Sequence, residues 1–121
     1  MKISVQEYIR EDDSNPFKIW FDDLDHQAAA KVATAILRME MGNTSNIKWF
    51  EGIGEYRIDW GPGYRLYLAQ DGDTLIILFV GGTKKGQQAD IEYAKALHAE
   101  YKARKKAAQS NKKPAAKNSR R

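Results

Sequence analysis

The chain has no cysteine among its 121 residues, which excludes disulfides and thiolate metal sites. Its two histidines, His26 and His98, do not stand at a spacing typical of metal ligands, so we expect neither a metal nor a cofactor. Long apolar runs are also missing, and the longest, Leu75–Val80, is far too short to span a bilayer. The first residues contain no apolar segment typical of a signal peptide. We therefore expect a cytoplasmic protein with no membrane partner.

Acidic residues are absent from residues 102–121, which hold nine of the 20 basic ones. The other 101 residues carry 11 basic and 16 acidic groups, a net charge of −5, although the whole chain is formally +4. Such a basic segment is attracted to polyanions, of which nucleic acid is the commonest, and the alternative is a solvated tail without a partner. The polar composition beyond Lys106 predicts one compact domain over residues 1–106 and a disordered basic tail over 107–121.

The apolar content of 42% suffices for one core, and its period along the chain predicts the secondary structure. Asn15-Pro16 and Asp25 are typical of helix starts, Gly42-Asn43 of a helix end, and Gly81-Gly82 of the end of a strand. The expected strands are 3–9, 55–60, 64–69 and 75–80, the expected helices are 16–24, 26–41 and 87–106, and 43–54 is expected to be an irregular connection.

This order predicts an α+β domain in which an N-terminal αα-hairpin and a C-terminal helix pack on an antiparallel four-stranded sheet. The second helix is expected to bury one apolar stripe. That stripe is predicted to contain Ala29, Val32, Ala33, Ile36, Leu37 and Met41.

A resemblance to a known family becomes specific between residues 54 and 91. The run G-E-Y-R-I-D-W-G-P-G-Y-R-L-Y, an apolar strand and then G-G-T-K-K-G-Q-Q-A-D-I resemble the phage-derived addiction-module killer proteins of the RelE/ParE/HigB toxin superfamily. The earlier segments F-K-I-W-F-D-D-L and R-M-E-M-G-N are similar to that family too. The resemblance covers nearly all of residues 3–100, and the basic tail lies outside it.

The resemblance implies a RelE-like fold and a toxin of a type II toxin–antitoxin system. In the RelE and HigB branches it implies an mRNA interferase, a metal-independent endoribonuclease that cuts mRNA on the ribosome and inhibits translation. The implied partners are the ribosome, mRNA and a cognate antitoxin, often a helix-turn-helix protein. The ParE branch instead inhibits DNA gyrase, which leaves gyrase inhibition as an alternative.

Metal-free RNA cleavage uses the substrate's 2′-OH as the nucleophile and needs cations around the phosphate, together with proton transfer. By resemblance, Arg65 occupies the arginine of G-Y-R, Arg57 a basic position on the preceding strand, and Lys84 or Lys85 the basic position after the central strand. Arg57 and Arg65 lie opposite the large apolar side chains of their own strands, which predicts that they share one sheet face. Tyr64, Tyr67, Lys102, Arg104, Lys105 and Lys106 are the candidate RNA-binding residues, and no residue is expected to bind a metal.

Two acids depart from the family pattern. Asp59 stands where several RelE-type enzymes carry another basic residue, and Asp90 falls near the position where some carry a catalytic tyrosine. Asp90 is therefore a candidate base, or alternatively a cap of the last helix. Arg57, flanked by Glu55 and Asp59, could instead form structural ion pairs, and Lys84-Lys85 could be solvated loop charge. A catalytically inactive member that binds only its antitoxin or nucleic acid is the third possibility.

Overall fold

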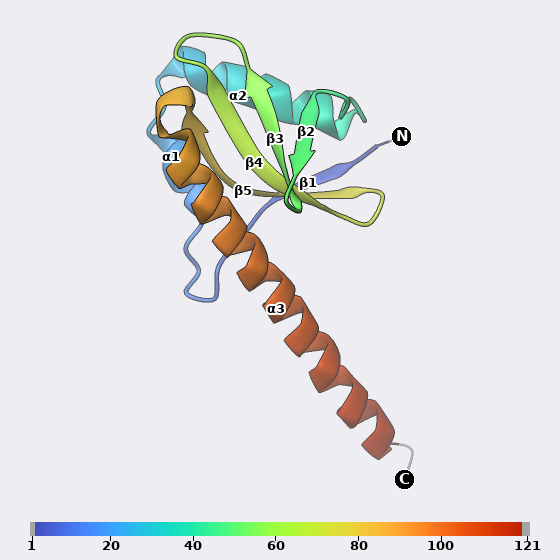
Figure 1. Ribbon diagram of the computed structural model, residues 1–121. Coiled ribbons are helices and arrows are strands. Elements are labelled where there is room, and N and C mark those ends of the chain that lie inside the picture. The colour runs from blue at the N-terminus through green and yellow to red at the C-terminus, as the bar shows by residue number, and fades with distance from the viewer. Residues whose placement is uncertain (1, 120–121) are drawn as a thin grey trace.

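The computed structural model describes the backbone of residues 2–119 and the side chains of residues 2–110. It is an α+β fold in which one sheet lies between two layers of helices (Figure 1). Its elements are β1 (Ser4–Glu7), α1 (Pro16–Asp22), α2 (His26–Glu40), β2 (Ile47–Phe50), β3 (Ile53–Ile58), β4 (Tyr64–Asp71), β5 (Leu75–Thr83), the 3-10 helix η1 (Lys84–Gly86) and α3 (Gln87–Ser119).

The two helix starts predicted from the sequence are confirmed. Asn15 precedes α1, and its side-chain oxygen accepts a hydrogen bond from the Lys18 amide at 3.0 Å. Asp25 precedes α2 and accepts from the Ala28 amide at 2.8 Å. Each cap satisfies an amide that has no partner within its own helix, so short polar side chains fix where both helices begin.

The apolar stripe of α2 lies about one residue away from its predicted place. Ala28, Val32, Ala35 and Met39 are buried, whereas Leu37 and Met41 are more than half exposed. Small alanines on the buried side let α2 approach the sheet closely. The predicted stripe is therefore confirmed at Val32, which is buried, and at Ile36, which packs partly against the core. It is wrong at Ala33, Leu37 and Met41, which are exposed.

The predicted four-stranded antiparallel sheet is wrong in two respects. The sheet has five strands in the order β1-β5-β4-β3-β2, and β1 runs parallel to β5 at one edge. The extra strand, β2, lies in the segment expected to be irregular and pairs with β3 through a turn at Glu51 and Gly52, both with positive φ. Four residues without clear alternation give little sequence signal for β2, and the direction of β1 depends on contacts distant in the sequence.

β5 continues through Gly81 and Gly82 to Thr83, so the strand end predicted at the glycine pair is wrong. Both glycines are needed because side chains of neighbouring helices approach the strand backbone closely there, and neither glycine forms a turn. A Cβ on Gly81 would lie 2.3 Å from the Trp20 ring, and one on Gly82 would lie 1.9 Å from a carboxylate oxygen of Asp90. These two residues therefore let side chains of α1 and α3 contact the strand from opposite faces.

The two faces of the sheet carry separate apolar clusters. Helices α1 and α2 cover one face, where Leu66 and Leu68 of β4 are buried. The N-terminal part of α3 covers the other face through Ala94 and Leu97, which pack near Phe79 of β5. As a result, side chains that alternate along β3 and β4 contact different helices.

α3 extends well beyond the sheet, as Figure 1 shows. The helix end predicted near Lys106 and before Pro114 is wrong, because the helix continues to Ser119. Disorder was predicted for residues 107–121. The side chains from residue 111 onward and the whole of residues 120–121 lie outside the described residues. Within residues 2–119, no helix combines the length and apolar character needed to cross a membrane.

Candidate functional site

Arg57 and Arg65 are direct partners across β3 and β4. Tyr56, which precedes Arg57, and Leu66, which follows Arg65, belong to the cluster under α1 and α2. Because side chains alternate along a strand, the two arginines lie on the face of the sheet that α3 covers. The prediction that they share one face is therefore confirmed.

A buried carboxylate, Glu55, lies between the two arginines and is 1% exposed. Its Oε1 accepts from Nε of Arg57 at 2.8 Å, and its Oε2 lies 3.5 Å from Nε of Arg65. Oε2 also accepts from the Tyr67 hydroxyl at 3.1 Å and from Nε2 of Gln87, the first residue of α3, at 2.9 Å. We call these five residues the Glu55 cluster. It links β3 and β4 to the start of α3.

Glu55 is charged and Tyr67 is neutral at physiological pH. Burial alone would raise the pKa of Glu55, but the hydrogen bonds from Arg57 and Tyr67 outweigh it, and the pKa lies below its usual value. Burial, with the nearby Glu55 charge, raises the pKa of Tyr67 well above that of a free tyrosine. Tyr67 therefore acts as a hydrogen-bond donor to the carboxylate, and no proton is taken from it at neutral pH.

The two arginines differ in their access to solvent. The side chain of Arg57 is 47% exposed, whereas that of Arg65 is 9% exposed. Arg57 uses Nε to bind Glu55, which leaves the outer end of its guanidinium group for an incoming anion. Nε of Arg65 is buried, and no hydrogen-bond acceptor for it is found among the described residues. Arg65 thus contributes positive charge from inside the cluster, and the charge of Arg57 itself lies at the surface.

Lys84 and Lys85 occupy η1, directly after β5, and both are exposed. The Lys84 amide donates to the carbonyl of Gly63 at 2.9 Å. The Cβ of Lys84 and Nη1 of Arg65 lie 3.8 and 3.9 Å from the point where a Gly63 Cβ would stand. Lys84 and the guanidinium group of Arg65 therefore both lie near Gly63, and of the two lysines Lys84 is the one with a described contact to the turn before β4.

Asp90 lies in the first turn of α3, inside the helix rather than at its cap. Its carboxylate lies against Gly82 and Gly86, and Gly82 is the strand partner of Arg65. Burial raises the pKa of Asp90, because little water reaches its charged form. The structure thus brings Asp90, Arg57, Arg65 and Lys84 to one end of the sheet.

The two candidate tyrosines do not present free rings at this end. Tyr64 is buried on the other face, with its ring centroid 6.2 Å from those of Trp20 and Trp60. Tyr67 is completely buried beneath the Glu55 cluster. Stacking of RNA bases requires an accessible ring face, and neither tyrosine offers one.

The four basic candidates on α3 lie apart from the cluster. Lys102 is 15 positions after Gln87, which corresponds to about 22 Å along the helix. Arg104 donates to the Ile9 carbonyl at 2.8 Å, and Lys105 pairs with Asp71 at 2.7 Å. Lys102 and Lys106 are exposed. Arg104 and Lys105 therefore anchor α3 to other parts of the fold.

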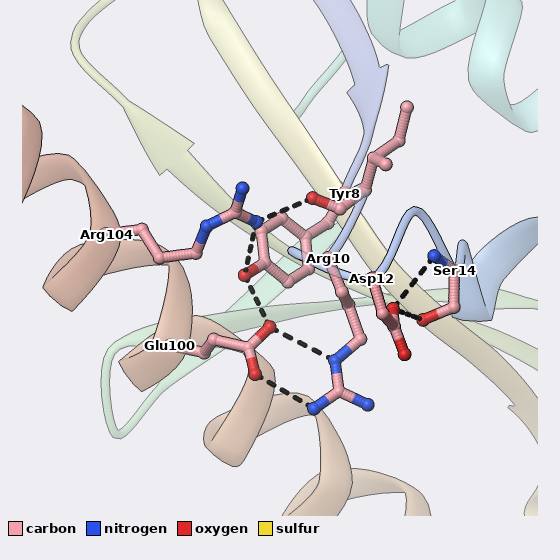
Figure 2. Close-up of polar contacts among 7 residues, drawn as sticks. Tyr8, Arg10, Asp12, Ser14, Glu100 and Arg104 are labelled. Atoms are coloured by element: carbon pink, nitrogen blue, oxygen red, sulfur yellow. Dashed lines mark hydrogen bonds and ion pairs between the residues drawn. The ribbon is translucent and has the colours of Figure 1, made fainter.

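A second polar network fixes α3 to the start of the chain (Figure 2). Glu100 accepts from the Tyr8 hydroxyl at 2.6 Å and from Nη2 of Arg10 at 2.9 Å, and Arg104 donates to the same hydroxyl at 3.2 Å. Neither this network nor Gln87 was predicted from the sequence, whereas the alternative expected for Arg57, a structural ion pair with Glu55, is present at 2.8 Å. The alternation of β3 does place Glu55 on the face of Arg57, but no local signal indicates that α3 returns to contact it.

The chemistry available at this end of the sheet is electrostatic. Three exposed cations, Arg57, Lys84 and Lys85, and the inner Arg65 outnumber the two carboxyl groups, Glu55 and Asp90, so a phosphate is attracted there. Among the described side chains, those of residues 2–110, no group of three or more histidine or carboxylate side chains is arranged to hold a metal ion.

The fold and the cluster define an α+β protein with a mixed five-stranded sheet and a buried carboxylate that binds two arginines. A Haemophilus influenzae protein described as uncharacterized is 43% identical to it over 83 residues, which cover 67% of this chain and 84% of the relative. The chain belongs to the same family as that protein. It matches no family model, and no solved structure matches it.

Proposed function

We propose that the protein is a toxin of the RelE/HigB type, an endoribonuclease that cuts mRNA on the ribosome and stops translation. The observation that carries the proposal is the convergence of Arg57, Arg65 and Lys84 at one end of the sheet. Three separate parts of the chain supply these cations, and a phosphodiester is the substrate group that such a set would bind.

Each cation has a distinct part in the proposed reaction. The 2′-OH of the substrate attacks the adjacent phosphorus, the bond to the 5′-oxygen of the next nucleotide breaks, and a 2′,3′-cyclic phosphate is left. Arg57 and Lys84 or Lys85 contact the phosphate, where the negative charge increases in the transition state. Arg65 supports this potential from its buried place.

Proton transfer falls to Asp90 in this proposal. Its raised pKa brings the carboxyl closer to the range in which a group both accepts and donates protons. Asp90 takes the proton from the 2′-OH, and water delivers one to the leaving 5′-oxygen. The cognate partner in this proposal is an antitoxin, and the site of action is the cytoplasm.

The burial of Arg65 favours one second candidate, a member of the family that binds RNA or an antitoxin without cleaving. It would use the same exposed cations and would need no proton transfer. Inhibition of gyrase, the other alternative, requires no phosphate site, and nothing in the arrangement of these residues favours it.

Pulse labelling of cells after induction tests the proposal. We expect incorporation of labelled amino acids to fall before incorporation of labelled thymidine. The double variant Lys84→Ala, Lys85→Ala should leave protein synthesis intact and the fold unchanged, because both side chains are exposed. Lys18→Ala, which removes an exposed lysine from α1, is the matched control. Early loss of DNA synthesis would contradict the proposal and favour the gyrase alternative.

A further inference from the structure

A groove of about 280 Å³ lies between α2 and the edge of β3. The pairing of β2 with β3 ends at Ile47 and Tyr56, so β2 does not continue alongside Arg57 and Ile58. The chain then passes through Asp59 to Trp60, and both residues line the groove. This end of β3 therefore leaves space where a further strand residue would otherwise lie.

Positive charge dominates the walls of the groove. Lys31 and Arg38 project from α2 seven positions apart, which places them on one face about 10 Å from each other along the axis. Arg57 lines the groove too, although its guanidinium group binds Glu55 on the other face of the sheet, and Asp59 is the single acid of the lining. Among the described residues, neither Lys31 nor Arg38 lies within ion-pair distance of a carboxylate, unlike Lys18, which pairs with Asp22 at 3.0 Å. Both cations are therefore free of a carboxylate partner among the described residues and can bind an anion.

An aromatic ring is held in place beside these cations. Trp60 stacks on Tyr64 with their centroids 6.2 Å apart and their planes 22° from parallel. The ammonium group of Lys31 lies 5.8 Å from the Trp60 centroid. Tyr64 supports the half-buried indole, and the flexible Lys31 side chain lies over the ring. A base that stacks on Trp60 takes the place of the ammonium group, which then moves to the phosphate of that nucleotide.

We propose that this groove binds one nucleotide of single-stranded RNA, with its base against Trp60 and its phosphates at Lys31 and Arg38. Arg57 lines the groove, and its guanidinium group belongs to the Glu55 cluster, so the groove and the cluster adjoin at the edge of β3. The inference names a subsite for the RNA of the proposed function and rests on it for its substrate class.

Fluorescence anisotropy of the full chain with a fluorescein-labelled hexa-adenylate RNA tests the groove. At about 0.1 M salt we expect Lys31→Ala and Arg38→Ala each to raise the dissociation constant about fivefold. Each substitution should also lower the slope of log affinity against log salt by about 0.7. Lys18→Ala, the matched control, should bind like the wild type. Equal affinity of all four proteins would overturn the proposal.

The base contact has its own test. Trp60→Ala should weaken binding on the order of tenfold. Trp60→Phe keeps a ring against Tyr64 and should retain most of the affinity. The phenylalanine variant also provides the test if the alanine variant does not fold. An abasic ribose-phosphate oligomer of the same length should compete at least tenfold less well than hexa-adenylate. Equal competition would mean that the groove binds anions without a base, and the proposal would be wrong.

The outcomes separate this inference from the proposed function. If RNA binding depends on Lys31, Arg38 and Trp60 but induction does not stop translation, the groove stands and the toxin proposal fails. If translation stops and the groove variants bind RNA and stop translation like the wild type, the groove proposal fails alone. Binding of an acidic peptide at these residues, with no binding of RNA, would also overturn it.

Discussion

Arg57 and Arg65 are paired across β3 and β4 and share one carboxylate, that of Glu55. Two guanidinium groups at adjacent positions repel each other, and the buried negative charge offsets this repulsion. The same carboxylate leaves the outer end of Arg57 exposed and keeps Arg65 inside. Of the two arginines that share Glu55, Arg57 is therefore the one that an incoming anion can reach.

Glu55→Gln should therefore destabilise the fold. The substitution leaves Arg65 buried without its counter-charge, a situation that typically costs about 3 kcal/mol. Urea unfolding at pH 7 measures the loss, with Glu51→Gln, an exposed glutamate in the nearby turn, as the control. Because the folded pKa of Glu55 is lowered, its contribution is complete above the unfolded value near 4.5 and is lost as pH falls through the folded value. The difference between wild type and variant should shrink in that acidic range, and a difference independent of pH would contradict this account.

His98 should make stability depend on pH in a higher range. Burial, with a smaller effect of Lys102, lowers the pKa of His98, whose ring lies 5.5 Å from that of Phe79. A depressed folded pKa means that the contribution is complete above the unfolded value of about 6.5 and is lost as pH falls. We expect the thermal midpoint to fall between pH 7 and pH 5, and to fall less for His98→Gln. Parallel curves for the two proteins in this range would show that the His98 ring is not desolvated as described.

The two glycines of β5 should respond differently to alanine. In Gly81→Ala the new Cβ meets the rigid Trp20 ring at 2.3 Å, so we expect a loss of about 2 kcal/mol or more in unfolding free energy. In Gly82→Ala it meets the end of the Asp90 side chain, which can rotate away, so we expect about 1 kcal/mol or less. Chemical denaturation of both variants checks the order, and a larger loss for Gly82→Ala would contradict it.

The Tyr8–Glu100–Arg10 network should fix the middle of α3 to the segment that follows β1. Glu100→Gln keeps an acceptor for the Tyr8 hydroxyl but removes the ion pair with Arg10. We expect faster hydrogen exchange for the α3 amides around Glu100 and no change for those of α2. Glu92→Gln, an exposed substitution on the same helix, provides the control. Equal protection in wild type and Glu100→Gln would mean that apolar packing alone holds this part of the helix.

The parts of the fold predicted correctly from the sequence have local causes. The caps at Asn15 and Asp25 act within four residues of themselves, and strand alternation places Arg57 and Arg65 on one face. The predictions that failed depend on distant contacts. The Gly81-Gly82 pair resembles a turn until Trp20 and Asp90 are known to lie against it.

The site shows the same division between local and distant causes. Family resemblance gave most weight to Arg65, but burial makes Arg57 the arginine that solvent reaches. Gln87, which completes the Glu55 cluster, is 32 residues away from Glu55 in the chain. Periodicity places a residue on a face, but not the helix that will cover that face, so the cluster as a whole could not be predicted.

The proposed cleavage chemistry is tested most directly by the ends of the cut RNA. Total RNA from cells expressing the wild type should contain mRNA fragments that end in a 2′,3′-cyclic or 3′-phosphate, with a 5′-hydroxyl on the downstream fragment. Loss of one transition-state cation typically costs 2–4 kcal/mol, so cuts should fall by about a hundredfold or more with Lys84→Ala, Lys85→Ala and remain with Lys18→Ala. Fragments with 3′-hydroxyl and 5′-phosphate ends, or wild-type levels of cutting by the double variant, would contradict the account.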